Sequence, residues 1–61
     1  MPMTPKEMVN LLQANGWTYD HSSGSHRIFY KKGFRPIVVP FHAKELSKGM
    51  EQAILKQAGL K

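Results

Sequence analysis

The sequence predicts a single α+β domain over residues 1–61, in which two helices lie on one face of a three-stranded antiparallel sheet, in the order α-β-β-β-α. Three observations favour this fold class. Apolar residues recur at helical spacing in the first and last segments, and each segment ends in a glycine followed by an apolar residue. Between these segments the apolar period changes to two, as in strands. The intervening turns are short, which favours an antiparallel meander.

The first helix is expected over residues 5–15. Its start has the pattern of a capping box, in which the Thr4 hydroxyl accepts from the Glu7 amide and the Glu7 carboxylate accepts from the Thr4 amide. Proline at the first helical position is tolerated because no helical hydrogen bond needs its missing N–H. Gly16 is expected to end the helix in the left-handed conformation, which brings Trp17 against the last turn.

Three strands are expected at residues 17–19, 25–31 and 34–39, with turns at 20–24 and at Lys32-Gly33. Because Pro36 lacks a donor for the strand ladder, the third strand should lie at an edge of the sheet. In the second strand, alternation places His26 with Ile28 and Tyr30 on one face, and Arg27 with Phe29 on the other. Both faces carry apolar residues, so the pattern leaves open which face the helices cover. If His26 lies on the open face, Phe29 is core.

The second helix is expected to begin after Ser47 as N-cap and to run to about Ala58. Its apolar stripe comprises Met50, Ala53, Ile54, Gln57 and Ala58. Gly59-Leu60 then repeats the ending seen at Gly16-Trp17, so both helices should terminate by the same motif.

The composition narrows the function classes. Nine Lys and Arg against four Asp and Glu give a net charge of +5, so nucleic acid or an acidic protein surface is the expected partner. The absence of cysteine excludes a disulfide framework and fits a reducing compartment, with cytoplasm as the expectation. The start lacks the apolar core of a signal peptide, and no apolar run approaches the roughly 20 residues of a membrane span.

Histidines are the best candidates for chemistry. His26 follows the small residues Gly24 and Ser25, whose exposed amides can approach a phosphate. Near neutral pH an imidazole has both protonation states, so it can take a proton from an RNA 2′-hydroxyl or return one to the leaving 5′-oxygen. The competing interpretation is an exposed strand histidine with no role. The histidine spacing does not suggest a metal site, and no pair of carboxylates has helical spacing.

His42 is a candidate for the second acid–base group. In an antiparallel meander the end of the third strand lies near the beginning of the second, so His42 is expected close to His26. The alternative is that His42 only caps a loop or packs on Phe41.

Basic residues concentrate in the middle of the chain, where six of the nine lie between residues 27 and 48. The expected RNA or phosphate ligands, besides Gly24 and Ser25, are Arg27, Lys31, Lys32 and Arg35. A generic solvated surface is the competing account of these side chains. Tyr30 is placed to stack on a base if its face is open.

The chain resembles the HicA-type mRNA interferase toxins of toxin–antitoxin pairs over nearly its whole length. The resemblance is carried by Asn15-Gly16-Trp17, Gly24-Ser25-His26, Val39-Pro40-Phe41-His42, Leu46-Ser47-Lys48-Gly49 and the stretch 54–60. It implies a double-stranded-RNA-binding-domain-like fold, metal-independent cleavage of mRNA that arrests translation, and no cofactor. It further implies that His26 is catalytic and that a HicB-type antitoxin covers the surface around it.

Two positions depart from the family pattern. Members often carry a second histidine where this chain has Arg27, and often proline where it has Ser47. The same topology and basic surface also fit a non-catalytic RNA-binding module. A DNA-binding domain is disfavoured because the strands separate the two helices, which leaves no helix-turn-helix.

Overall fold

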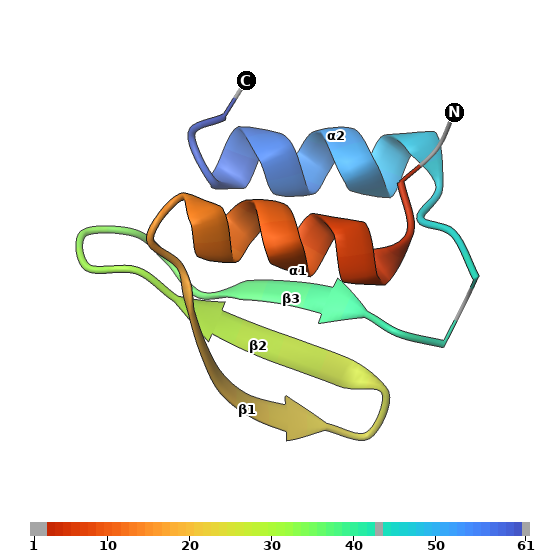
Figure 1. The fold of residues 1–61 in the computed structure, drawn as a ribbon, viewed down its shortest axis with the longest axis horizontal. Coiled ribbons are helices and arrows are strands. Elements are labelled where there is room, and N and C mark those ends of the chain that lie inside the picture. The colour runs from red at the N-terminus through yellow and green to blue at the C-terminus, as the bar shows by residue number, and fades with distance from the viewer. Residues whose placement is uncertain (1–2, 43, 61) are drawn as a thin grey trace.

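The computed structural model describes residues 3–42 and 44–60 and has the predicted α-β-β-β-α order. The elements are α1 (Pro5–Ala14), β1 (Thr18–Ser23), β2 (His26–Tyr30), β3 (Ile37–Pro40) and α2 (Lys48–Gln57). The strands form one antiparallel sheet in the order β1-β2-β3, and the two helices lie side by side along it (Figure 1). Both helices contact β3, and α1 also contacts β1. Within the described ranges, no helix has the length and apolar character needed to cross a membrane.

Both helices begin where predicted, and each ends one residue earlier than expected, with Asn15 and Ala58 as C-caps. The Thr4 hydroxyl accepts from the Glu7 amide at 3.1 Å, and the Glu7 carboxylate accepts from the Thr4 amide at 2.9 Å, which completes the capping box. The Trp17 amide donates to the Leu12 carbonyl at 3.0 Å, which is the long hydrogen bond of a Schellman motif. In α2 the Ser47 hydroxyl caps the first turn, and the Leu60 amide repeats the Schellman bond.

The first strand and its turn differ from the prediction. The expected turn over residues 20–24 is wrong, because β1 continues through Ser23 and only Gly24 and Ser25 form the hairpin loop. A bulge between Tyr19 and His21 accommodates one extra residue, Asp20. Every residue of β1 is exposed, so the strand lacks the apolar alternation that identifies strands from sequence.

The second and third strands are shorter than expected. β2 begins at His26 instead of residue 25, and β3 begins at Ile37 instead of residue 34. Phe34 leaves the sheet because its ring packs edge-on against Trp17, with centroids 5.4 Å apart. Pro36 therefore lies before β3, which is an edge strand as predicted.

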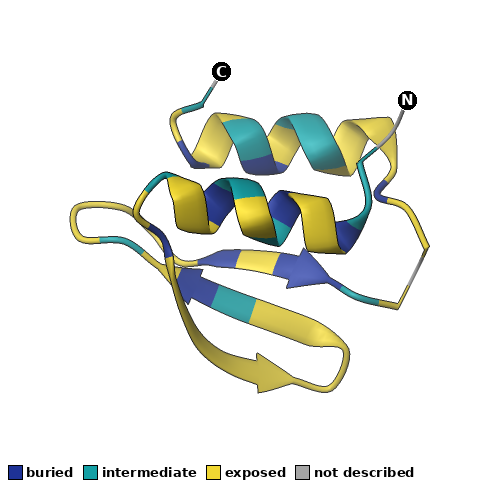
Figure 2. Ribbon diagram, viewed as in Figure 1, coloured by how far each residue is buried: buried dark blue, intermediate teal, exposed yellow. Residues whose placement is uncertain are grey.

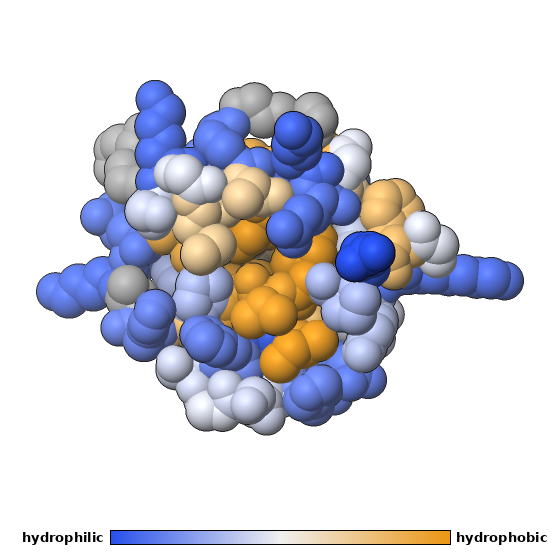
Figure 3. Space-filling view, turned by 180° about the vertical axis from the view of Figure 1, so that it is seen from behind, coloured by the Kyte–Doolittle hydropathy of each residue, from blue (hydrophilic) through white to orange (hydrophobic). Residues whose placement is uncertain are grey.

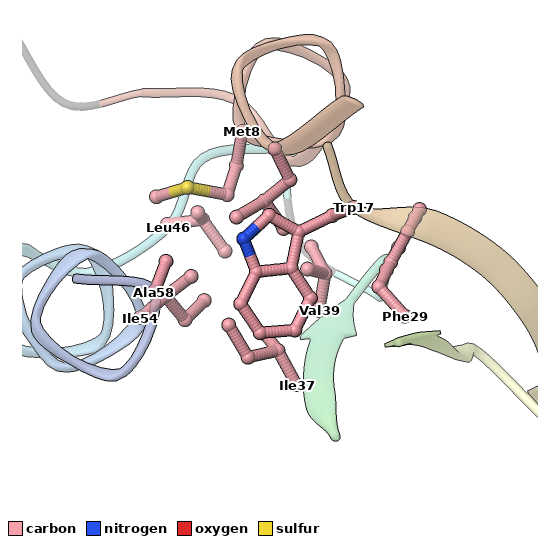
Figure 4. Close-up of a cluster of buried hydrophobic side chains, with 9 residues drawn as sticks. Met8, Trp17, Phe29, Ile37, Val39, Leu46, Ile54 and Ala58 are labelled. Carbon is pink, nitrogen blue, oxygen red and sulfur yellow. The ribbon is translucent and has the colours of Figure 1, made fainter. Parts of the chain in front are cut away.

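One face of the sheet is core and the other is open. Phe29 is 1% exposed and Ile28 is only partly buried, so the helices cover the Phe29 face and the His26 face is open. The core comprises Met8, Leu12, Trp17, Phe29, Ile37, Val39, Leu46, Ile54 and Ala58. Figure 4 shows the Trp17 ring at the centre of this cluster, between α2 and the sheet. Burial is concentrated in the helices and β3, whereas β1 is exposed along its length (Figure 2).

Candidate active site at one end of the sheet

His26 is the first residue of β2 and lies directly after the hairpin loop. Gly24 has a φ of +60°, as expected at the first position of a two-residue hairpin loop of the II′ type. The short loop fixes the register in which Ser23 pairs with His26. His26 is therefore held on a paired strand, with its side chain exposed on the open face.

His42 reaches the same place from β3. His26 pairs with Pro40, and the next amide, that of Phe41, donates to the Ser25 carbonyl at 2.7 Å. This bond fastens the end of β3 to the hairpin loop. The imidazole rings of His26 and His42 lie edge to face, with centroids 5.8 Å apart. The predicted proximity of the two histidines is therefore present.

The third histidine, His21, has a different environment. Its Nδ1 lies 2.5 Å from the Asp20 carboxylate, in an exposed pair on β1. Neither the His26 nor the His42 imidazole has a hydrogen-bond partner among residues 3–42 and 44–60. Both rings of the close pair are thus available to an external group.

The histidine pair lies at the edge of a groove of about 450 Å³ between β3 and α2. Its lining comprises His26, Pro36, Val38, Pro40, His42, Met50, Ala53, Ile54 and Gln57. An adjoining smaller hollow shares Pro40, His42 and Met50 and extends to Glu45, Leu46 and Ser47. Seen from behind, the molecule has a central apolar patch ringed by polar side chains (Figure 3). The arrangement offers two imidazoles beside an apolar surface.

The part of the chain that the structure describes contains no candidate metal site. No group of three or more His, Cys, Asp and Glu side chains is close enough there to hold a metal ion.

The predicted phosphate ligands divide between the two ends of β2. Gly24 and Ser25 adjoin His26. Lys31 lies about 17 Å further along the strand direction, at roughly 3.3 Å per residue. Lys32 and Arg35 belong to the loop beyond it and are exposed. The structure thus brings Gly24 and Ser25 to the histidines and places Lys31, Lys32 and Arg35 away from them.

Arg27 lies on the covered side of the sheet, as alternation predicts. Its guanidinium stacks over the Phe41 ring, 4.3 Å from the centroid. Since Phe41 immediately precedes His42 and donates to Ser25, the Arg27 contact supports the segment that carries His42.

The sequence predicted one stripe of Met50, Ala53, Ile54, Gln57 and Ala58 on the second helix, but not that part of this stripe forms a groove wall. Ile54 and Ala58 are buried as expected, but Met50, Ala53 and Gln57 are exposed. The polar Gln57 within an otherwise apolar stripe is the signal that part of this stripe faces outward.

Comparison with known proteins identifies the class. A chain in a solved toxin–antitoxin complex from Streptococcus pneumoniae superimposes with a TM-score of 0.86 and 50% sequence identity, covering 97% of this chain and 100% of that chain. A family model described as the HicA toxin of bacterial toxin–antitoxin systems matches residues 5–60. The chain therefore belongs to the HicA toxin family, as the resemblance had implied. Among curated proteins, none matches.

Proposed function

We propose that this toxin is an endoribonuclease that cleaves mRNA by acid–base catalysis at His26 and His42, without a metal ion, and so arrests translation in the cytoplasm. The observation that carries the proposal is the pair of exposed imidazoles with centroids 5.8 Å apart at the edge of the groove. Membership of the HicA toxins and the charge of +5 support an RNA substrate.

The chemistry needs one base and one acid. One imidazole, neutral, takes the proton from a 2′-hydroxyl, whose oxygen forms a bond to the adjacent phosphorus. The bond from phosphorus to the 5′-oxygen breaks, and the second imidazole, protonated, gives its proton to that oxygen. The products are a 2′,3′-cyclic phosphate and a 5′-hydroxyl. General acid–base catalysis of this kind contributes about 10²- to 10⁴-fold in rate.

The surrounding residues have supporting roles in this proposal. The Gly24 and Ser25 backbone adjoins His26 and is placed to approach the scissile phosphate. Arg27, Lys31, Lys32 and Arg35 contact phosphates of the flanking RNA, with the last three acting several nucleotides from the cut. Tyr30, 44% exposed on the open face, can stack on a base.

An antitoxin is the second partner in this proposal. The structural neighbour comes from a toxin–antitoxin complex, and the exposed groove with its two histidines is the surface whose covering would silence cleavage. We assign this role to an acidic, HicB-type antitoxin, since its charge would complement that of the toxin.

The test is cleavage of a ribo-oligonucleotide in EDTA by the wild-type protein, His26→Ala and His21→Ala. We expect His26→Ala to lose at least about 100-fold in rate. His21→Ala should stay within about twofold, because His21 does not line the groove. The His26→Ala protein should remain folded, still bind antitoxin, and no longer arrest growth when induced.

Three results would overturn the assignment. Undiminished cleavage by His26→Ala excludes His26 as a catalytic residue. If the wild-type protein cleaves RNA without EDTA but not with it, the reaction depends on a metal ion. Wild-type protein that shifts RNA on a gel but leaves it intact over hours indicates the alternative, a non-catalytic RNA-binding module. An all-deoxy oligonucleotide should resist cleavage because it lacks the nucleophile.

A further inference from the structure

The groove has a defined direction relative to the histidines. Met50, Ala53 and Gln57 follow one another along one side of α2, at helical spacing, and face Pro36, Val38 and Pro40 on the β3 side. Pro40 and Met50 also share the adjoining hollow with His42. The histidines therefore lie at the Met50 end, and Gln57 lies about 10 Å along the helix from it, at roughly 1.5 Å per residue.

The walls of the groove expose large apolar side chains to water. Val38 is 45% exposed and Met50 is 42% exposed, and both line the groove. Apolar walls that carry a few polar groups are typical of small-ligand sites. Here it adjoins the proposed cleavage site on a basic protein, and the ring of polar side chains around it is visible in Figure 3.

We propose that the groove binds the nucleobase of a nucleotide next to the scissile phosphate, and that Gln57 selects which base is accepted. The inference rests on the proposed function for the position of the phosphate. A nucleobase is flat and apolar on its faces, which suits the walls formed by Val38, Met50 and Ala53. Bases of single-stranded RNA can be splayed out of the strand and read by hydrogen bonds to their edges.

Gln57 supplies the polar contact that a base edge needs. Among the described residues of the groove lining, only Gln57 and the two histidines have side-chain nitrogen or oxygen atoms. Its amide both donates and accepts, as the edges of the four bases require in different combinations. No hydrogen bond to Gln57 from another side chain occurs within the described ranges, and the residue is exposed.

The dimensions of the groove agree with this occupant. Its volume of about 450 Å³ falls within the range of roughly 300–1,000 Å³ typical of small-molecule sites. An apolar side chain of a protein partner would use the walls but not the Gln57 amide. We therefore assign the groove of the free toxin to a base, which the antitoxin of the proposed function would displace, and treat a groove that binds protein alone as an outcome of the test.

The first experiment compares cleavage-site preference, read by sequencing the ends of a randomised RNA. In Gln57→Ala, we expect the preference for the favoured base beside the cut to fall about tenfold, while cleavage persists. Ala53→Leu, at an exposed position, should narrow the groove and disfavour purines there. The matched control is Gln13→Ala, which removes an exposed glutamine from α1 and should leave the preference unchanged. An unchanged preference in both groove variants overturns the inference while leaving the proposed function intact.

The second experiment does not depend on cleavage. A trinucleotide with a 2′-deoxy centre is titrated into the wild-type protein, and the methyl NMR signals of Val38, Met50 and Ala53 are followed. Saturable shifts in these methyls that weaken at least about fivefold in Gln57→Ala support the base site even if no RNA is cleaved. If the trinucleotide causes no shift, or if only the antitoxin shifts these methyls, the base assignment is overturned.

Discussion

The two ends of β2 have opposite environments. At the His26 end the side chains are exposed, and a two-residue loop and one backbone bond to Phe41 hold the segment. Near the other end Phe29 is buried, and the loop after Tyr30 packs through Phe34 against residues that follow the two helices. There Phe34 contacts Trp17, its ring lies 5.0 Å from the Lys31 ammonium, and Gly59 lies beneath it. Figure 2 shows the exposed His26 end of β2 and the buried position of Phe29 before the exposed Tyr30.

This difference indicates that one end of β2 contributes to the stability of the domain and the other end to its proposed activity. In a domain of this size every apolar contact counts, because only about 60% of the unfolded surface is buried. The contacts that hold the loop at residues 31–36 involve Lys31, which the sequence grouped with the phosphate ligands. Substitutions at the Phe34 and Gly59 contact should therefore alter unfolding, and substitutions at the His26 end should alter activity.

The largest effect on stability is expected for Phe34→Ala. Replacing a fully buried phenylalanine by alanine lowers the free energy of unfolding by about 3–5 kcal/mol. Because Phe34 is 41% exposed, we expect a smaller loss of about 2 kcal/mol. Tyr30→Ala is the matched control, since Tyr30 is similarly exposed but lies on the open face, and it should lose less than half as much. Urea unfolding measures both. Equal losses would contradict the structural role of the Phe34 end.

Two glycines with positive φ offer a finer comparison. A Cβ on Gly59 would lie 3.4 Å from the Phe34 ring, whereas a Cβ on Gly24 would meet nothing within 4 Å. Both substitutions by alanine incur backbone strain of about 1–2 kcal/mol, since φ is +73° and +60°. We expect Gly59→Ala to unfold more easily than Gly24→Ala, and only Gly24→Ala to slow cleavage by the folded protein. The reverse order in thermal unfolding would exclude the Phe34–Gly59 contact as a constraint.

The smallest effect is expected for Lys32→Ala. Lys32 is exposed in the loop, so its loss should change the free energy of unfolding by no more than about 0.5 kcal/mol. If it contacts a phosphate, the slope of log affinity against log salt should fall by about one. Lys6→Ala, an exposed lysine of α1, is the control and should leave the slope unchanged. Identical slopes for all three proteins would favour the generic solvated surface.

The parts of the fold that were predicted are those specified by local chemistry. The capping box at Thr4 and Glu7 and both Schellman endings depend on few residues at fixed spacing, and each is present. The approach of His42 to His26 was predictable for a related reason, since antiparallel pairing dictates which strand ends meet.

The parts that were not predicted depend on tertiary contacts. β1 is long because it pairs with β2, although its residues 20–23 have the composition of a turn. Residues 34–36 leave the third strand because Phe34 packs on Trp17. The outward position of Met50, Ala53 and Gln57 depends on how α2 lies against β3, which no helical periodicity specifies.

The most direct test of the histidine pair is a double-mutant cycle on the rate of RNA cleavage with His26→Ala, His42→Ala and the double variant. Two groups that act as base and acid in one step are strongly non-additive. We therefore expect the double variant to cleave within about threefold of the slower single variant. Losses that multiply, or a wild-type rate for His42→Ala, would contradict a shared catalytic step.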